Sequence, residues 1–200
     1  MNKDYIKAGR SKQKQKTRDR ILAGAKDLLN RTNHFSLDDV AEVTSLSRAT
    51  IYRYFSSAEA LSLEAALDLG TKSPEEVLHS IDGKNDLEQT VLGIQDYFNQ
   101  LALNNESVFR KYLSTVITQP PEGRKRGARR HHTLEKALKE LNPEISPSDR
   151  KKFIVVATAL MGVEPIIVTK DVSGLTDKRT KEVLSWGMQT LLKGLLNQHK

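Results

Sequence analysis

Apolar residues recur at helical spacing along almost the whole chain, while the alternating pattern of β-strands is nearly absent. The stretch from Gln13 to Asn30 shows this spacing clearly. From Ile21 onward, apolar residues follow at offsets of one, four, seven and eight positions. Such offsets place the side chains on one stripe of an α-helix. The sequence therefore predicts an all-α protein.

Serine, glycine and proline residues mark where one helix ends and the next begins. Ser36, Ser47 and either Ser56 or Ser57 are suited to cap helix N-termini, and Pro165 should bend the penultimate helix. We expect helices over residues 13–30, 37–43, 48–55, 58–69, 87–103, 107–118, 128–141, 147–168 and 176–197.

The composition restricts the chemistry available to this chain, which has 200 residues, a net charge of +7 and no cysteine. Without cysteine it can form no disulfide, thiolate metal site or cysteine nucleophile. The N-terminus lacks an apolar stretch, and no apolar run is long enough to span a bilayer. These features lead us to expect a cytoplasmic protein.

Positive charge is concentrated at the N-terminus. Residues 1–20 contain eight Lys or Arg and two Asp, which gives +6 of the total +7. A basic arm of this kind can displace counterions from DNA. A solvated tail without a partner is the alternative. Lys14, Lys16 and Arg18 are the arm residues that we expect at the DNA.

The segment Ser36–Phe55, which reads SLDDVAEVTSLSRATIYRYF, contains two short helices joined by a tight turn. Helices of about eight residues are not stable alone, so they must pack on each other and on the preceding helix. Ile51 and Phe55, four positions apart, should bury the inner face of the second helix.

The outer face of this second helix carries Arg48, Ala49, Thr50, Tyr52 and Arg53. These residue types suit the major groove of DNA. Arginine can pair with both acceptors of guanine, alanine and threonine can touch the thymine methyl group, and tyrosine can reach phosphate. The pattern predicts a recognition helix whose N-terminal residues meet base edges.

The same segment resembles the helix-turn-helix of TetR-family transcription regulators. The block T-I-Y-x-Y-F at residues 50–55 carries most of the resemblance, which covers roughly residues 13–65. The remainder agrees in helical character and length. The matching residues are Ser36, Val40, Ala41, Thr44, Leu46, Ser47, Thr50, Ile51, Tyr52, Tyr54, Phe55, Ser57 and Leu61.

The resemblance implies two domains, with a basic arm and helix-turn-helix over residues 1–57 and a helical ligand-binding and dimerisation domain over residues 58–200. It also implies phosphate contacts from Tyr52 and Tyr54. The expected DNA-binding residues are Lys14, Lys16, Arg18, Ser36, Ser47, Arg48, Ala49, Thr50, Tyr52, Arg53, Tyr54 and Ser57.

Two positions depart from the family pattern. Ser45 stands where the family has a turn glycine, and a left-handed backbone there would strain a serine unless the turn differs. Ala58 replaces a lysine that commonly contacts phosphate in the family, which shifts the expected phosphate anchoring towards the basic arm.

The last two long helices are apolar on more than one side, so they should serve both an intrachain core and a partner. The resemblance implies that they form a four-helix homodimer interface. A purely intrachain bundle is the alternative. The expected interface residues are Val156, Leu160, Val163, Val183, Trp186, Gly187, Leu191 and Gly194.

The resemblance further implies a cavity for a small organic effector in the C-terminal domain. The same aromatic and apolar residues could instead be ordinary core, and the isolated acid Glu164 could form a salt bridge rather than meet a cationic ligand. The candidate lining residues are Tyr97, Phe98, Leu101, Phe109, Tyr112, Leu113, Val116 and Met161.

The function that these features predict is a sequence-specific repressor that binds a pseudo-palindromic operator as a homodimer. The alternative is a nonspecific, nucleoid-type DNA-binding protein without an effector. We expect no enzyme, cofactor or metal site, because no nucleophile is supplied and His131–His132 lack metal-ligand spacing. A second basic cluster, expected to be a solvated connector, consists of Arg124, Lys125, Arg126, Arg129 and Arg130.

Overall fold

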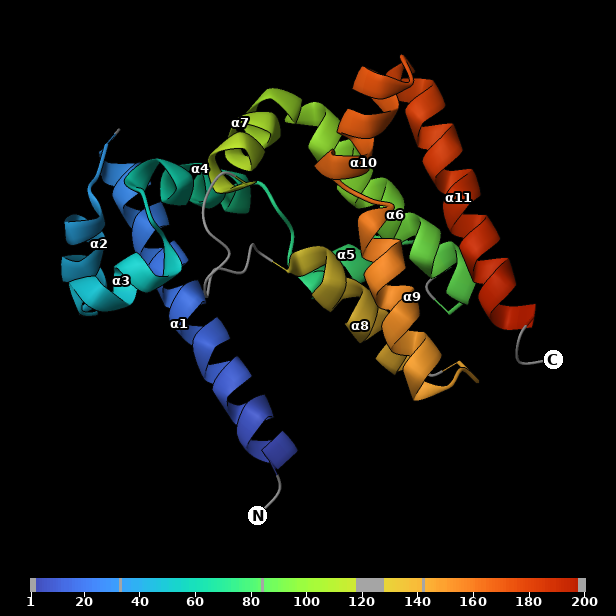
Figure 1. Ribbon diagram of the computed structural model, residues 1–200, viewed down its shortest axis with the longest axis horizontal. Helices are drawn as coiled ribbons and strands as arrows, with labels where there is room; N and C mark the ends of the chain where they lie inside the picture. Colours follow the sequence, from blue (N-terminus) through green and yellow to red (C-terminus); the bar gives the residue numbers. More distant parts are fainter. Residues whose placement is uncertain (1–2, 33, 84, 118–127, 142, 198–200) are drawn as a thin grey trace. The chain divides into compact units, whose positions relative to one another are not determined.

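A computed structural model describes residues 3–32, 34–83, 85–117, 128–141 and 143–197 of the chain (Figure 1). All regular elements in these ranges are helical, which confirms the all-α fold class. The chain forms two compact units. The N-terminal unit comprises Met1–Thr71 and Arg110–Arg126, and the C-terminal unit comprises Lys72–Phe109 and Gly127–Lys200.

The N-terminal unit contains α1 (Lys3–Arg31), α2 (Leu37–Thr44), α3 (Arg48–Tyr54), α4 (Ala58–Leu69) and, from Arg110, the rest of α7 (Glu106–Ile117). Two expectations are corrected here. Helix α1 begins ten residues before the expected Gln13, so the backbone of the basic arm is helical. The division between the units falls after Thr71 rather than residue 57, because α4 packs on α1.

The core of the N-terminal unit joins all four of its N-terminal helices. Ile51 and Phe55 are buried in it, as the sequence predicted for the inner face of the second short helix. The buried residues of this core are Ile21, Leu22, Ala25, Leu37, Val40, Ala41, Ile51, Phe55, Leu61 and Ala65.

Serine side chains start the three short helices of this unit. Ser36 Oγ accepts from the Asp39 N–H at 3.2 Å, and the Asp39 carboxylate accepts from the Ser36 N–H at 2.7 Å, which completes a capping box. The side chains of Ser47 and Ser57 likewise accept a backbone N–H at the start of α3 and of α4. The predicted caps are confirmed, and Ser57 rather than Ser56 is the third.

Gly24 lets α1 and α2 approach closely. A Cβ atom at this position would lie 2.5 Å from Thr44 Cγ2, well inside normal contact distance. The sequence suggested Ala41 as the small residue at the helix crossing, and Ala41 is indeed buried. The requirement for glycine at position 24 became visible only in the packed structure.

The C-terminal unit contains α5 (Pro74–His79), α6 (Leu87–Asn104), the start of α7, α8 (Arg129–Leu141), α9 (Pro147–Ala159), α10 (Val163–Ile167), the π-helical turn η1 (Val168–Val172) and α11 (Asp177–Asn197). Helix α6 packs against α5, α8, α10 and α11 and is central to the unit (Figure 1). The sequence did not predict α5, a six-residue helix that Ser73 caps.

The predicted penultimate helix is broken rather than bent at its proline. Helix α9 ends at Ala159 and α10 begins at Val163, and the segments on either side of the break meet at 48°. The backbone turns at Gly162, where φ is +89°, a value that favours glycine. Pro165 lies in the first turn of α10, where a missing N–H is tolerated.

Polar side chains from α6 and α8 satisfy the backbone at this break. Gln95 Nε2 donates to the carbonyl oxygens of Leu160 and Leu184, both at 2.9 Å. Asn99 Oδ1 accepts from the Gly162 N–H at 2.8 Å, and the Arg130 guanidinium donates to the Met161 carbonyl. The break is therefore held by buried and partly buried hydrogen bonds, as an interrupted helix inside a core requires.

Among the described residues, no single helix is long and apolar enough to cross a membrane. The bent pair of Pro147–Ala159 and Val163–Val172 reaches that length and apolarity only when its two parts are combined.

Candidate nucleic-acid interface

The turn between α2 and α3 is built on a left-handed serine. Ser45 has φ 51° and ψ 37°, and the following Leu46 N–H donates to the Ala41 carbonyl at 3.1 Å. This is a common way to end a helix, but it usually employs glycine. The structure thus has the left-handed backbone that the family pattern implies, with serine carrying the strain.

Helix α3 presents opposite faces to the core and to solvent. Ile51 and the C-cap residue Phe55 are buried, whereas Arg48, Ala49, Tyr52 and Arg53 are exposed. Tyr52 is 50 % exposed although it is aromatic. An exposed face of this composition is chemically suited to base edges and phosphates.

Local contacts restrain the start of this face. Arg48 Nε lies 3.2 Å from Asp38 Oδ1, and the hydroxyls of Ser47 and Thr50 are 2.8 Å apart. The Arg48 side chain is largely exposed, so this ion pair contributes little and can exchange for a base or phosphate contact. Thr50 is only half-exposed and already has a hydroxyl partner.

The end of α3 carries a stacked pair. The Arg53 guanidinium carbon lies 5.6 Å from the centre of the Tyr54 ring, which is within the range of a cation–π contact. Tyr54 is half-buried against the core of the N-terminal unit. The contact keeps Arg53 near the outer face of the helix.

Arg18 is not available for DNA, contrary to the sequence expectation. It is 7 % exposed, its guanidinium pairs with the Glu64 carboxylate, and it stacks 5.1 Å from the centre of the Phe55 ring. Lys14 and Lys16 are exposed, as a phosphate contact requires. Arg18 lies at helical spacing from the buried Ile21, Leu22 and Ala25 of α1, so its side chain faces the core. The sequence prediction followed this spacing only from Ile21 onward.

Tyr112, an expected ligand-pocket residue, belongs to the same buried cluster. Its hydroxyl donates to Glu64 Oε2 at 2.8 Å, so Glu64 joins α4 to both α1 and α7. The cluster of Arg18, Glu64 and Tyr112 lies inside the N-terminal unit. The sequence offered no signal for it because its members are far apart along the chain.

The remaining expected serine contacts have a structural role. The hydroxyls of Ser36, Ser47 and Ser57 each accept a backbone N–H at the start of a helix. Ser36 and Ser47 are exposed, whereas Ser57 is half-buried. Ala58, the residue that replaces the family's lysine, is the first residue of α4.

The other predicted pocket residues are core or surface residues. Phe98 and Met161 are buried in the core of the C-terminal unit, and Tyr97 and Leu101 pack against it. The Tyr97 hydroxyl accepts from the Lys72 N–H at 2.7 Å, and burial raises the pKa of this tyrosine. Three residues of α7 are partly exposed, namely Phe109, Leu113 and Val116.

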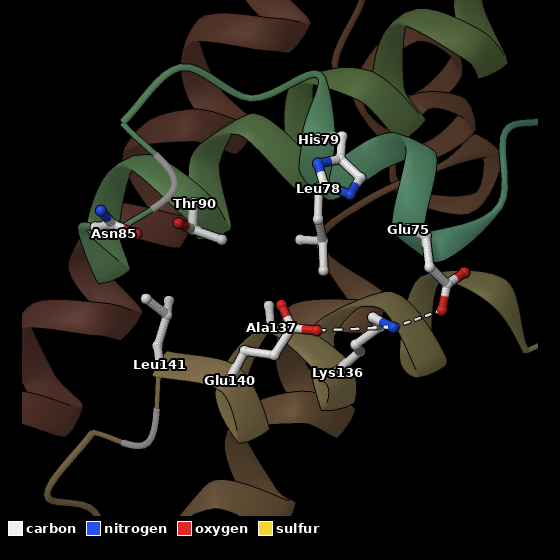
Figure 2. Close-up of a pocket in the computed structure, with 9 residues that line it drawn as sticks. All are labelled: Glu75, Leu78, His79, Asn85, Thr90, Lys136, Ala137, Glu140 and Leu141. Carbon is white, nitrogen blue, oxygen red and sulfur yellow. Dashed lines mark hydrogen bonds and ion pairs between the residues drawn. The ribbon is translucent and has the colours of Figure 1, made fainter.

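A cavity of about 280 Å³ lies elsewhere in the C-terminal unit, between α5, the start of α6 and α8 (Figure 2). No residue of the predicted pocket lines it, so the predicted lining does not describe this cavity. Its lining residues are Glu75, Leu78, His79, Asn85, Thr90, Lys136, Ala137, Glu140 and Leu141.

Most of the predicted dimer residues lie on the surface of the C-terminal unit. Val156 and Val183 are each 45 % exposed and Trp186 is 67 % exposed, whereas Leu160 and Leu191 are half-buried. A Cβ added at Gly187 or Gly194 would have no neighbour within 4 Å.

One of the expected dimer residues, Val163, is 6 % exposed within the single chain and is therefore a core residue. Val155, which was not among the expected dimer residues, is exposed on α9. The burial of Val163 follows from the break after Ala159, because the break changes the helical phase of the residues that come after it.

The isolated acid of the sequence has a partner. Glu164 forms a two-pronged ion pair with Arg130, with distances of 2.9 and 3.1 Å. Arg130 is therefore a partly buried and paired side chain rather than part of a solvated connector, while Arg124, Lys125 and Arg126 lie outside the described residues. No three His, Asp or Glu residues in the described ranges are placed to hold a metal ion.

Comparison with known proteins gives distant structural likeness, of which NalD is one example. No family model and no curated protein sequence matches this chain. A solved structure of NalD, described as the secondary repressor of the MexAB-OprM multidrug efflux pump in Pseudomonas aeruginosa, is 15 % identical and has a TM-score of 0.39. The match covers 91 % of this chain and 98 % of that one. Likeness at this level does not assign a function.

Proposed function

We propose that this protein is a sequence-specific DNA-binding transcription regulator, a repressor of the TetR type. The observation that carries this proposal is the helix-turn-helix formed by α2 and α3, which buries Ile51 and Phe55 and exposes Arg48, Tyr52 and Arg53. The T-I-Y-x-Y-F block at residues 50–55, which resembles the family, belongs to this helix-turn-helix. Arg48 and Arg53 read base edges, Ala49 touches a thymine methyl, and Tyr52 binds phosphate.

The repressor acts as a homodimer on a pseudo-palindrome. One recognition helix reads too few bases for a unique site, and two helices about 34 Å apart read two half-sites. The interface is formed by α9 and α11, because Val155, Val156, Val183 and Trp186 are exposed and apolar. Positions 183, 186, 187, 190 and 194 recur at helical spacing, so they share one face of α11.

A small organic effector releases the dimer from DNA. It does so by favouring a state whose two recognition helices do not match the half-site spacing. Affinity for DNA then falls by the factor by which the effector prefers that state.

The principal experiment measures affinity at one fixed salt concentration for random DNA and for the DNA upstream of the protein's own gene. A regulator binds its site at least about a thousandfold more tightly than random DNA. Equal affinity for both would favour the alternative, a nonspecific architectural protein, because that class depends on phosphate contacts alone.

Variants of α3 separate base contacts from phosphate contacts. Replacing Arg48 or Arg53 with alanine is expected to relax base preference by about 1–3 kcal/mol, whereas Tyr52→Phe weakens all sequences equally. Arg31→Ala, at the exposed end of α1, is the charge-matched control. Unchanged affinity and site preference in both arginine variants would refute the base contacts.

The dimer is tested by sedimentation of the full chain. Trp186→Glu places a charge on the apolar face and is expected to give monomers. Ile117→Glu makes the same change at an apolar residue that is 71 % exposed on α7, outside the proposed face, and should leave the dimer intact. A wild-type chain that is monomeric and still binds its site tightly would refute the homodimer.

A further inference from the structure

The cavity in the C-terminal unit has a mixed lining, one part of which is apolar. Leu78 and Ala137 are buried in its wall, and Leu141 stands at the end of α8. Figure 2 shows Leu78 and Leu141 pointing into the same space from different helices. Ala137 leaves this space open, because its methyl group is much smaller than the leucines at positions 134, 138 and 141 of the same helix.

The rim of the cavity is charged on the α5–α8 side. Lys136 Nζ lies 2.5 Å from Glu75 Oε1 and 3.7 Å from Glu140 Oε1, so one ammonium stands between two carboxylates (Figure 2). The hydrogen bond with Glu75 raises the pKa of Lys136, with a smaller contribution from Glu140. Glu75, Glu140 and Lys136 together give this rim one net negative charge.

The two carboxylates of the rim are not equivalent. Glu75 holds Lys136 at hydrogen-bond distance, whereas the contact of Glu140 with Lys136 is too long for a hydrogen bond. An incoming anion would have to compete with Glu75 for the ammonium. An incoming cation can use Glu140 without breaking the short ion pair.

The size of the cavity limits the ligand. Its volume of about 280 Å³ corresponds to about nine molecules of liquid water at about 30 Å³ each. A molecule of about nine or ten non-hydrogen atoms fits, provided that part of it remains at the open rim. Such a molecule can bury a small hydrocarbon body and leave its polar end at Glu140.

We propose that this cavity binds small organic cations, with the apolar body between Leu78, Ala137 and Leu141 and the ammonium group on Glu140. The inference names a ligand class for the effector. It rests on the proposed repressor function only for the consequence for DNA, and binding to the cavity itself does not depend on that function.

The test uses the full chain without DNA and three probes, 2-phenylethylamine, the neutral 2-phenylethanol and the anionic phenylacetate. Each is titrated at pH 7 while backbone amide resonances are recorded by NMR. We expect the amine to shift amides of residues 75–79 and 136–141 with a Kd of about 1 mM, as suits so small a ligand. It should bind at least about threefold more tightly than the alcohol, and the anion should be weakest.

Variants connect this preference to the cavity. Glu140→Gln should remove the difference between amine and alcohol, while Glu144→Gln, an exposed acid outside the cavity, should preserve it. Ala137→Leu fills the interior and should abolish binding of both probes, with the amide spectrum serving as the check that the variant folds.

Amine-induced shifts confined to other residues, or a Glu140→Gln variant that keeps the full amine preference, would overturn the proposal. A chain that binds the amine at this cavity but shows no preferred DNA site would instead refute the repressor function alone. The two failures are therefore distinguishable.

Discussion

The N-terminal unit buries a charged pair, whereas the C-terminal unit buries neutral amides. Arg18 and Glu64 lie between three helices with their charges paired and with Tyr112 as a further donor. Gln95 and Asn99 instead serve backbone groups at the break between α9 and α10. Removing the partner of a buried ion lowers the free energy of unfolding far more than removing the partner of a buried amide. The two units should therefore respond differently to single substitutions.

The largest effect is expected for Glu64→Gln, because it leaves the Arg18 charge unpaired inside the N-terminal unit. We expect a loss of about 3–5 kcal/mol in the free energy of unfolding, measured by urea denaturation. The matched control is Glu59→Gln on the same helix, whose exposed pair with Lys111 should contribute less than about 1 kcal/mol. Similar losses in the two variants would contradict a buried charge pair.

A smaller loss is expected for Gln95→Leu in the C-terminal unit. The carbonyls of Leu160 and Leu184 both lose their side-chain donor, the first in a partly buried and the second in a buried position, which should cost about 1–3 kcal/mol. Gln100→Leu, on the exposed side of the same helix, is the control and should stay within about 0.5 kcal/mol of wild type. If thermal unfolding shows no difference between these variants, the amide does not hold the break.

A gain in stability is expected at the turn of the helix-turn-helix. Ser45→Gly removes the strain of a left-handed serine and should stabilise the protein by about 1 kcal/mol. Ser173→Gly provides the contrast, because Ser173 also ends a helical turn but has φ −97°. Glycine there should give no gain, since it only adds freedom to the unfolded chain. Differential scanning calorimetry of both variants measures this contrast.

The smallest effects are expected for the two capping boxes, one of which lies in each unit. Hydrogen bonds from the Ser36 backbone and side chain lower the pKa of Asp39, and those from Ser73 lower the pKa of Glu76. Because the pKa of each carboxyl is lower in the folded protein, the unfolded chain binds its protons at a higher pH than the folded protein does as the pH falls. The stabilisation is therefore present above the ordinary carboxyl pKa of about 4 and is lost as the pH falls through the folded-state pKa.

Measuring the free energy of unfolding between about pH 2 and 6 tests this expectation. Asp39→Asn and Glu76→Gln should each flatten part of the pH dependence. Asp19→Asn, which removes an exposed carboxyl on α1 outside both capping boxes, is the control. A curve that keeps its full slope in the double variant would show that the capping carboxylates do not contribute to acid sensitivity.

The sequence alone determined what depends on neighbours along the chain. Helical spacing gave the all-α class, the serines gave the caps, and the segment at residues 36–55 gave a helix-turn-helix with Ile51 and Phe55 inside. For Ser45 the sequence left two alternatives, a left-handed serine or a different turn, and the structure has the left-handed serine. These features are local, so a single short stretch carries the information for each.

Tertiary structure decided what depends on residues far apart. In the sequence, Arg18 is one more basic residue of the arm, and only the structure places Glu64 and Phe55 beside it. The long apolar run around Gly162 reads as one helix until Gln95, Asn99 and Arg130 supply partners for a break. A buried polar group is stable only when its partner is in place, and the partner's position is set by packing rather than by spacing along the chain.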